Sequence, residues 1–195
     1  LGGDAYINTI KNLGGNPEEP FVLFDETKEV YARRREELKG IVAERYAAKA
    51  EWAKANPEKA AKMEKWFSGA APEIDWTGFE QKANQATRAA SAACLGVIAQ
   101  QVENMVVSSA DLSNSDKTDG FLKHTKAITK DDFSGAFLQA GVAELTMACL
   151  CLGMALHGGV LAACGTFFVF SDYMKPAVRM AALMELPVKF IWSHD

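Results

Sequence analysis

The sequence has 195 residues, of which 49% are hydrophobic and 24% are charged. These fractions are ordinary for a globular protein and exclude a disordered or collagen-like chain. The formal net charge of -4 argues against a protein that binds the phosphate backbone of nucleic acids. Because the first residue is Leu1 rather than Met, and because Asp195 follows an apolar run directly, we expect the sequence to be a piece of a longer one.

Charged residues are concentrated in the first part of the chain. We therefore predict two parts, a charged helical segment over residues 1–80 and an α/β domain over residues 81–195. In the first part, the pattern predicts a helix over 26–54. The pair Asn56-Pro57 is a typical helix start, with Asn as the N-cap and Pro in the first turn, and it predicts a second helix that ends near Phe67.

Helical and strand patterns alternate in the second part. We predict helices over 86–101, 143–156 and 173–184, strands over 105–109, 133–138, 160–168 and 188–193, and a polar loop over 110–120. This alternation is typical of an α/β fold with a mostly parallel sheet flanked by helices. Ligands of such sheets bind at the carboxyl ends of the strands, which directs attention to Asp111, Phe170 and His194.

One apolar run could be mistaken for a membrane span. Residues 145–170 contain no Asp, Glu, Lys or Arg, and about 20 such residues suffice to cross a bilayer. Gly158-Gly159 interrupts the run, however, and a glycine pair is typical of a helix end. We therefore predict a helix, a turn and a buried strand here, and no membrane association.

The four cysteines form no CxxC pair and lie among small apolar residues. A disulfide framework or a zinc site is not expected from this spacing. We predict that the four cysteines, Cys94, Cys149, Cys151 and Cys164, are buried, reduced thiols of a cytoplasmic protein.

Glu144 is the acidic residue with the most suggestive position, because it opens a helix of apolar and small side chains. A buried carboxylate costs several kcal/mol unless it is paired or neutralised. Glu144 is either an acid at a helix N-terminus that interacts with the helix dipole, or a group that donates or accepts a proton in catalysis.

Aromatic and basic residues offer further candidates. Aromatic residues recur at intervals of three, at Phe167, Phe170 and Tyr173. They either pack in the core or form a pocket for a planar ring. Arg88 and Ser115 could each bind phosphate, Arg through its fork of donors, although an isolated Arg is more often a surface or salt-bridge residue.

Six short motifs in the second part resemble, in order, those of the transketolase family of thiamine-diphosphate enzymes. They are Ala86-Thr87-Arg88, Ser108-Ser109-Ala110-Asp111-Leu112, the segment from Gly141 to Met147, Ala155-Leu156-His157-Gly158-Gly159, the segment from Gly165 to Tyr173, and Ser193-His194-Asp195. The resemblance covers residues 86–195 and implies a pyrimidine-binding domain. Residues 1–80 resemble, more weakly, the helical segment that precedes this domain in the family.

The resemblance implies that Glu144 is catalytic and hydrogen-bonds N1′ of the cofactor's aminopyrimidine ring, which favours its imino tautomer. It places Phe167, Phe170 and Tyr173 in the pyrimidine pocket, with Asp111 and Leu112 near the cofactor. Arg88, Ser115 and His194 would hold a sugar phosphate. The implied reaction transfers a two-carbon ketol unit from a ketose phosphate to an aldose phosphate. The site residues that the resemblance implies are therefore Arg88, Asp111, Leu112, Ser115, Glu144, Phe167, Phe170, Tyr173 and His194.

The sequence also departs from the family pattern. Ala143 replaces the usual Arg before the glutamate, and Asn114 replaces a common Pro before Ser115. The family's motif for the diphosphate and its divalent metal, Mg²⁺ or Ca²⁺, is absent, so no metal ligand is predicted in this chain. The resemblance implies a cytoplasmic homodimeric parent enzyme and a fragment that is inactive alone. Two alternatives stay open, namely another thiamine-diphosphate enzyme, such as a deoxyxylulose-phosphate synthase-like protein, or a non-catalytic α/β dimerisation module.

Overall fold

A computed structural model describes residues 2–194 of the chain. It divides into two compact units, Leu1–Pro57 and Glu58–Asp195. Among the helices of residues 2–194, none is both long and apolar enough to cross a lipid bilayer.

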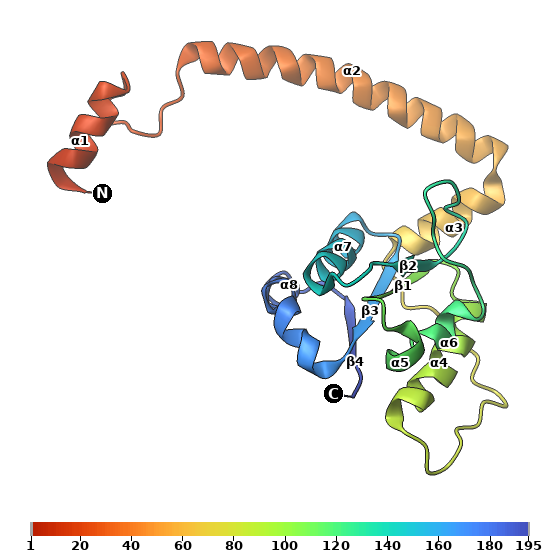
Figure 1. Cartoon of the computed structure of the whole chain (residues 1–195). Coiled ribbons are helices and arrows are strands. Elements are labelled where there is room, and N and C mark those ends of the chain that lie inside the picture. Colours follow the sequence, from red (N-terminus) through yellow and green to blue (C-terminus); the bar gives the residue numbers. More distant parts are fainter. Residues whose placement is uncertain (1, 195) are drawn as a thin grey trace. The chain divides into compact units, whose positions relative to one another are not determined.

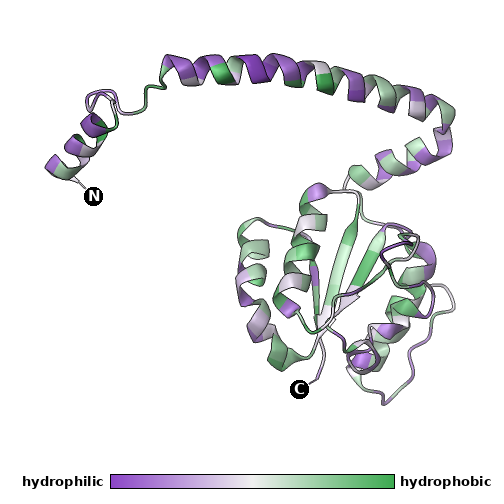
Figure 2. Ribbon diagram, turned by 45° about the horizontal axis from the view of Figure 1, so that its top comes forward, coloured by the Kyte–Doolittle hydropathy of each residue, from purple (hydrophilic) through white to green (hydrophobic). Residues whose placement is uncertain are grey.

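The first unit contains α1 (Gly3–Asn12) and α2 (Asp25–Ala55). The helix predicted over 26–54 is confirmed as α2, which Figure 2 shows as a ribbon with many hydrophilic residues. Ion pairs three residues apart support it, as between Arg34 and Glu37 at 2.8 Å. The helix ends at Ala55, and the side-chain amide of the next residue, Asn56, donates to the Trp52 carbonyl across 3.0 Å. Asn56 thus caps the end of α2, whereas the sequence predicted that it would cap the start of the next helix.

Helix α3 (Pro57–Phe67) starts at the proline, as predicted. It is attached to the α/β unit by an ion pair between Lys62 and Glu103 at 2.7 Å. The Phe67 ring lies over Gly159, where an added Cβ would come within 2.8 Å of a ring carbon. Because these contacts join α3 to the α/β unit, the charged segment 1–80 is divided between the two units. Its assignment as an interdomain segment stays a prediction.

The second unit is built on a four-stranded sheet with the order β2-β1-β3-β4 and only parallel pairs (Figure 1). The strands are β1 (Met105–Ser109), β2 (Phe137–Gln139), β3 (Leu161–Thr166) and β4 (Lys189–Trp192). The predicted parallel α/β class is therefore correct.

Two strand boundaries differ from the sequence prediction by more than one residue. Strand β2 begins at Phe137 rather than at residue 133, because Asp132 accepts hydrogen bonds from the backbone and hydroxyl of Ser134 and forms a turn there. Hydrogen bonds from Lys126 and Ser134 hold the pKa of Asp132 well below its usual range. Strand β3 ends at Thr166, and a one-turn 3₁₀ helix, η1 (Phe168–Phe170), follows it.

Helices cover both faces of the sheet (Figure 1). They are α4 (Thr87–Gln101), α5 (Ser113–Asp116), α6 (Asp119–Leu122), α7 (Glu144–His157) and α8 (Ser171–Leu183). Strand β3 shows the division, because Ala162 and Cys164 pack with α7 and α8 while Ala163 packs with Leu95 of α4 and Phe121 of α6. The short helices α5 and α6 occupy most of the segment that was predicted as a polar loop.

Strand β1 has its next strand in the chain, β2, on one side and the later strands β3 and β4 on the other. The chain passes from β1 to the edge strand β2, then returns through α7 to β3 and continues outward to β4. The strand order therefore reverses between β1 and β3. In an open parallel sheet, ligands bind outside the carboxyl ends of the strands at such a reversal, so the residues after Ser109 and Thr166 lie where a site is expected.

Candidate functional site

Glu144 is the first residue of α7 and is 6% exposed. The hydroxyl of Thr166, the last residue of β3, donates to Glu144 Oε1 across 3.4 Å. Strand β3 therefore delivers a donor to the carboxyl group at the reversal of the sheet. The carboxyl group is thus at a helix N-terminus and is also buried at the expected site, so both sequence interpretations of Glu144 stay open.

Three aromatic rings form a row directly after Thr166. Phe167 and Phe170 are stacked, with centroids 5.7 Å apart and an interplanar angle of 12°. Phe170 and Tyr173 are also stacked, at 6.0 Å and 21°. Phe167 and Phe170 are half-buried and Tyr173 is exposed. The row therefore has accessible ring surface, which core packing would not leave.

Arg88, Ser115 and His194 meet although they are far apart in the sequence. Arg88 Nη1 donates to the Ser115 carbonyl across 3.1 Å, and it lies 2.8 Å from Nδ1 and 2.5 Å from Nε2 of His194. Ser115 joins this cluster through its carbonyl, because its hydroxyl donates to Asn114 Oδ1 across 3.2 Å. Arg88 and His194 line a cavity of about 550 Å³.

His194 connects the basic cluster to the aromatic row. Its ring lies against that of Phe167, with centroids 4.6 Å apart. One continuous surface therefore runs from the Arg88 guanidinium through His194 to the aromatic rings. Phe167 in turn follows Thr166, the residue that donates to Glu144.

The loop after β1 carries Asp111 and Leu112. Asp111 is exposed and has a φ of 64°, in the left-handed region that an Asp tolerates better than most residues. The backbone N–H of Leu112 donates to the Ser109 hydroxyl across 3.2 Å. Both residues thus lie at the carboxyl end of β1, where the sequence predicted Asp111.

Sequence reasoning missed Asp116 in the same loop. Asp116 is 1% exposed and lines the cavity with Arg88 and His194. Its burial depends on Gly165 of β3, where an added Cβ would lie 2.5 Å from Thr118 Cγ2 and 3.3 Å from Asp116 Oδ2. A short polar stretch gives no signal of such burial.

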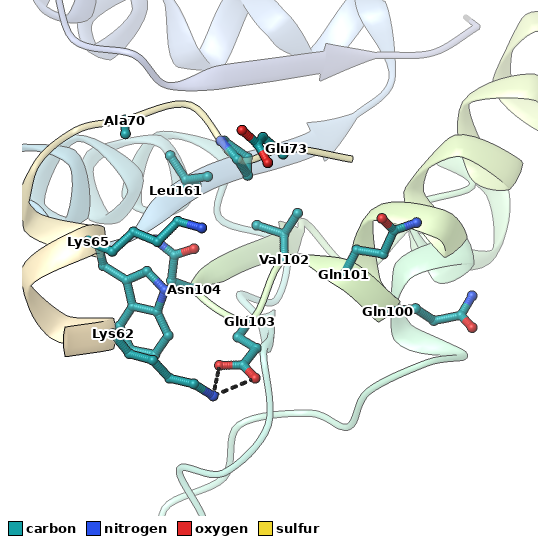
Figure 3. Close-up of a pocket in the computed structure, with 12 residues that line it drawn as sticks. Lys62, Lys65, Ala70, Glu73, Gln100, Gln101, Val102, Glu103, Asn104 and Leu161 are labelled. Carbon is teal, nitrogen blue, oxygen red and sulfur yellow. Dashed lines mark hydrogen bonds and ion pairs between the residues drawn. The ribbon is translucent and has the colours of Figure 1, made fainter. Parts of the chain in front are cut away.

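A second cavity, of about 290 Å³, lies at the opposite ends of the strands. Figure 3 shows Val102, Glu103 and Asn104 there, directly before β1, together with Leu161 at the start of β3. Lys62 is paired with Glu103 across this opening. The cavity is at the amino ends of β1 and β3, so it is not at the position where parallel sheets bind ligands.

The cysteines are all free, as predicted. Cys151 and Cys164 are buried, but Cys94 is half-buried and Cys149 is exposed, so the prediction of buried thiols is wrong for Cys149. Cys149 faces outward because α7 packs on the sheet through Met147, Ala148 and Cys151. Within residues 2–194, no group of three or more His, Cys, Asp or Glu side chains is arranged to hold a metal ion.

The sequence that forms this site matches a known protein family. The family described as "Transketolase, pyrimidine binding domain" matches residues 83–195. A transketolase of Halalkalibacterium halodurans is 37% identical over 196 residues, which cover 98% of this chain and 28% of that protein. A Bacillus subtilis transketolase is 42% identical over 143 residues, which cover 71% of this chain and 21% of that transketolase.

A solved structure shows the same architecture. The transketolase of Pichia stipitis in complex with sedoheptulose-7-phosphate superposes with a TM-score of 0.83 at 29% identity, and the match covers 100% of this chain and 30% of that one. The chain thus spans less than a third of the length of these relatives. With its parallel sheet, its buried Glu144 and its aromatic row, the chain belongs to the transketolase family and contains that family's pyrimidine-binding domain.

Proposed function

We propose that this chain is part of a transketolase that uses thiamine diphosphate to transfer a two-carbon ketol unit from a ketose phosphate to an aldose phosphate. The observation that carries the proposal is the buried carboxyl group of Glu144 at the reversal of the sheet, whose donor Thr166 is followed directly by the first of three stacked rings. A carboxyl group in such a place suits proton exchange with a bound heterocycle.

The residues present fit an aminopyrimidine ring. Such a ring needs a flat apolar surface and a partner for a ring nitrogen, and the row of Phe167, Phe170 and Tyr173 with Glu144 offers both. When bound, thiamine diphosphate supplies the nucleophilic thiazolium carbon. Glu144 would hold the proton at N1′, and Phe170 would stack on the pyrimidine. Asp111 and Leu112, at the carboxyl end of β1, would lie near the cofactor.

The basic cluster suits the phosphate group of a substrate. Arg88 presents a fork of donors that matches phosphate oxygens, and His194 lies against it in the same cavity. Ser115 completes this subsite. The Pichia stipitis complex with sedoheptulose-7-phosphate supports a sugar phosphate as the ligand.

The rest of the parent enzyme follows from the family. We assign residues 1–80 to the interdomain helical segment and residues 81–195 to the pyrimidine-binding domain. The metal, Mg²⁺ or Ca²⁺, would be held with the diphosphate by residues outside this chain. Exposed apolar side chains on α7, with Leu145 43%, Leu150 47% and Leu156 57% exposed, support a homodimer. Four free cysteines support a cytoplasmic location.

The test uses the full-length protein that contains this chain. We expect thiamine diphosphate with Mg²⁺ to raise its melting temperature, and a coupled assay with xylulose 5-phosphate and ribose 5-phosphate to show ketol transfer. A thermal shift without this activity would favour another thiamine-diphosphate enzyme. No shift and no activity would favour a non-catalytic α/β dimerisation module. The 195-residue chain by itself is expected to be inactive.

A further inference from the structure

Asp116 is a buried carboxylate that the proposed reaction does not use. It is 1% exposed and accepts three hydrogen bonds. Oδ1 accepts from the backbone N–H and the hydroxyl of Thr118, at 2.8 and 2.7 Å, and Oδ2 accepts from the Ser109 hydroxyl at 2.7 Å. A buried carboxylate is tolerated where its oxygens are satisfied in this way. The three donors therefore hold the side chain in one orientation.

These bonds close the loop between β1 and α6 around Asp116. The Ser109 hydroxyl that donates to Asp116 also accepts from the N–H of Leu112, and the N–H of Asp116 donates to the Leu112 carbonyl across 2.8 Å. Lys117, the next residue, has a φ of 70°. A non-glycine residue adopts this conformation where the surrounding structure holds it there. The carboxylate of Asp116 is at the centre of that structure.

The loop held in this way meets the basic cluster at one point. Arg88 Nη1 donates to the carbonyl of Ser115, the residue directly before Asp116, across 3.1 Å. The same Nη1 lies against His194. Arg88, Asp116 and His194 line one cavity of about 550 Å³. The carbonyl of Ser115 thus sets the direction of the guanidinium within this cavity.

We propose that Asp116 is a positioning residue, which fixes the Ser115 carbonyl and through it orients the Arg88 guanidinium toward the cavity. Only the identity of the bound group, the phosphate of a sugar, rests on the function proposed above. Asp116 does not touch the substrate. Its effect is exerted on the affinity for the phosphorylated end of the ligand, while proton exchange at Glu144 is left unchanged.

The kinetic test measures KM and kcat of the full-length enzyme with a phosphorylated ketose donor and with an unphosphorylated donor. We expect Asp116→Ala to raise KM for the phosphorylated donor about tenfold and to change kcat less than about twofold, since a group that binds ground state and transition state alike affects KM alone. Asp116→Asn keeps an acceptor oxygen for Thr118 and should recover most of the affinity. The matched control is Asp119→Asn, because Asp119 lies in the same segment but is paired with Lys123 at 2.8 Å.

A double-mutant cycle with Arg88 separates positioning from a general loss of folding. If Asp116 acts through Arg88, Asp116→Ala adds less than about twofold to the KM of Arg88→Ala, because residues that act as a unit are not additive. Three outcomes would each overturn the proposal. They are effects of Asp116→Ala and Arg88→Ala on KM that multiply in the double variant, a wild-type KM in Asp116→Ala, and an equal rise in KM with the phosphorylated and the unphosphorylated donor. If Asp116→Ala does not fold, Ser109→Ala removes one of the same bonds and replaces it in the cycle.

A second readout does not depend on activity. With ¹⁵N-labelled arginine, we expect the side-chain N–H signal of Arg88 to be sharp in the wild type and in Asp119→Asn, and broadened in Asp116→Ala. An unchanged Arg88 signal in Asp116→Ala would overturn the proposal whatever the enzyme does. A changed signal in a protein without ketol transfer would refute the proposed function and leave the positioning role supported.

Discussion

Thr166 Oγ1 donates to Glu144 Oε1 across 3.4 Å, so the last residue of β3 contacts the first residue of α7. Both residues are buried, at 0% and 6% exposure. The two residues are 22 positions apart in the sequence, with the rest of α7 and of β3 between them. The aromatic row begins at Phe167, directly after the residue that donates to this carboxyl group, and this relationship leads to the first prediction.

Glu144→Gln in the full-length enzyme is expected to reduce ketol transfer by about 10²–10⁴-fold, the range for loss of a positioned acid or base. The amide keeps the shape of the side chain and an acceptor for Thr166, so the melting temperature should stay near that of the wild type. Thr166→Val is the comparison, because it removes the hydroxyl and leaves the carboxyl group. Ketol transfer by Glu144→Gln at a rate close to that of the wild type would refute the catalytic role.

Arg88→Lys tests the phosphate subsite. A lysine keeps the charge but loses the planar fork of donors and its contact to the Ser115 carbonyl. We expect KM for sugar phosphates to rise about 10- to 100-fold, which corresponds to a charged hydrogen bond of about 1.5–3 kcal/mol. Steady-state kinetics with phosphorylated and unphosphorylated donors measures this. Arg179→Lys, on the exposed surface of α8, is the control, and an equal rise in that variant would contradict the assignment.

Sequence patterns predicted the central elements well because their signals are local. β1 lies at 105–109 as predicted, since a short apolar run there is followed by polar turn residues. β2 was placed too early. Its pattern is weak, and Asp132, which forms the turn that delays it, is also paired with Lys126 at 2.5 Å, six residues away.

The candidate site was predicted less completely than the fold. Arg88 and His194 were grouped only by the family resemblance, because they are 106 residues apart and meet only in the folded sheet. Asp116 was missed altogether. Its donors are close in sequence, but its burial is caused by the approach of the loop to Gly165 on a different strand. No periodicity in the polar stretch around it could indicate that approach.

Gly165→Ala tests this close approach. An added methyl group would lie 2.5 Å from Thr118 Cγ2, and overpacking of this kind costs about 1–3 kcal/mol of unfolding free energy. Gly153→Ala is the matched control, since an added Cβ meets nothing within 4 Å there. Because Gly153 is inside α7, that substitution should stabilise the protein by about 0.5–1 kcal/mol. Urea unfolding measures both, and equal stability in the two variants would refute the packing argument.

Thiol labelling tests the different environments of the four cysteines. Thiolate is the reactive form, and a hydrogen bond with Cys151 together with burial raises the pKa of the Cys164 thiol. We therefore expect an aromatic disulfide reagent at pH 8 to modify Cys149 of this chain rapidly and Cys94 more slowly. Cys151 and Cys164 should react only at the rate at which the α7–β3 core opens, so a destabilising change such as Gly165→Ala should accelerate them and leave Cys149 unaffected. Mass spectrometry of the labelled peptides assigns each rate, and fast labelling of Cys164 in the folded chain would contradict the packing of α7 on β3.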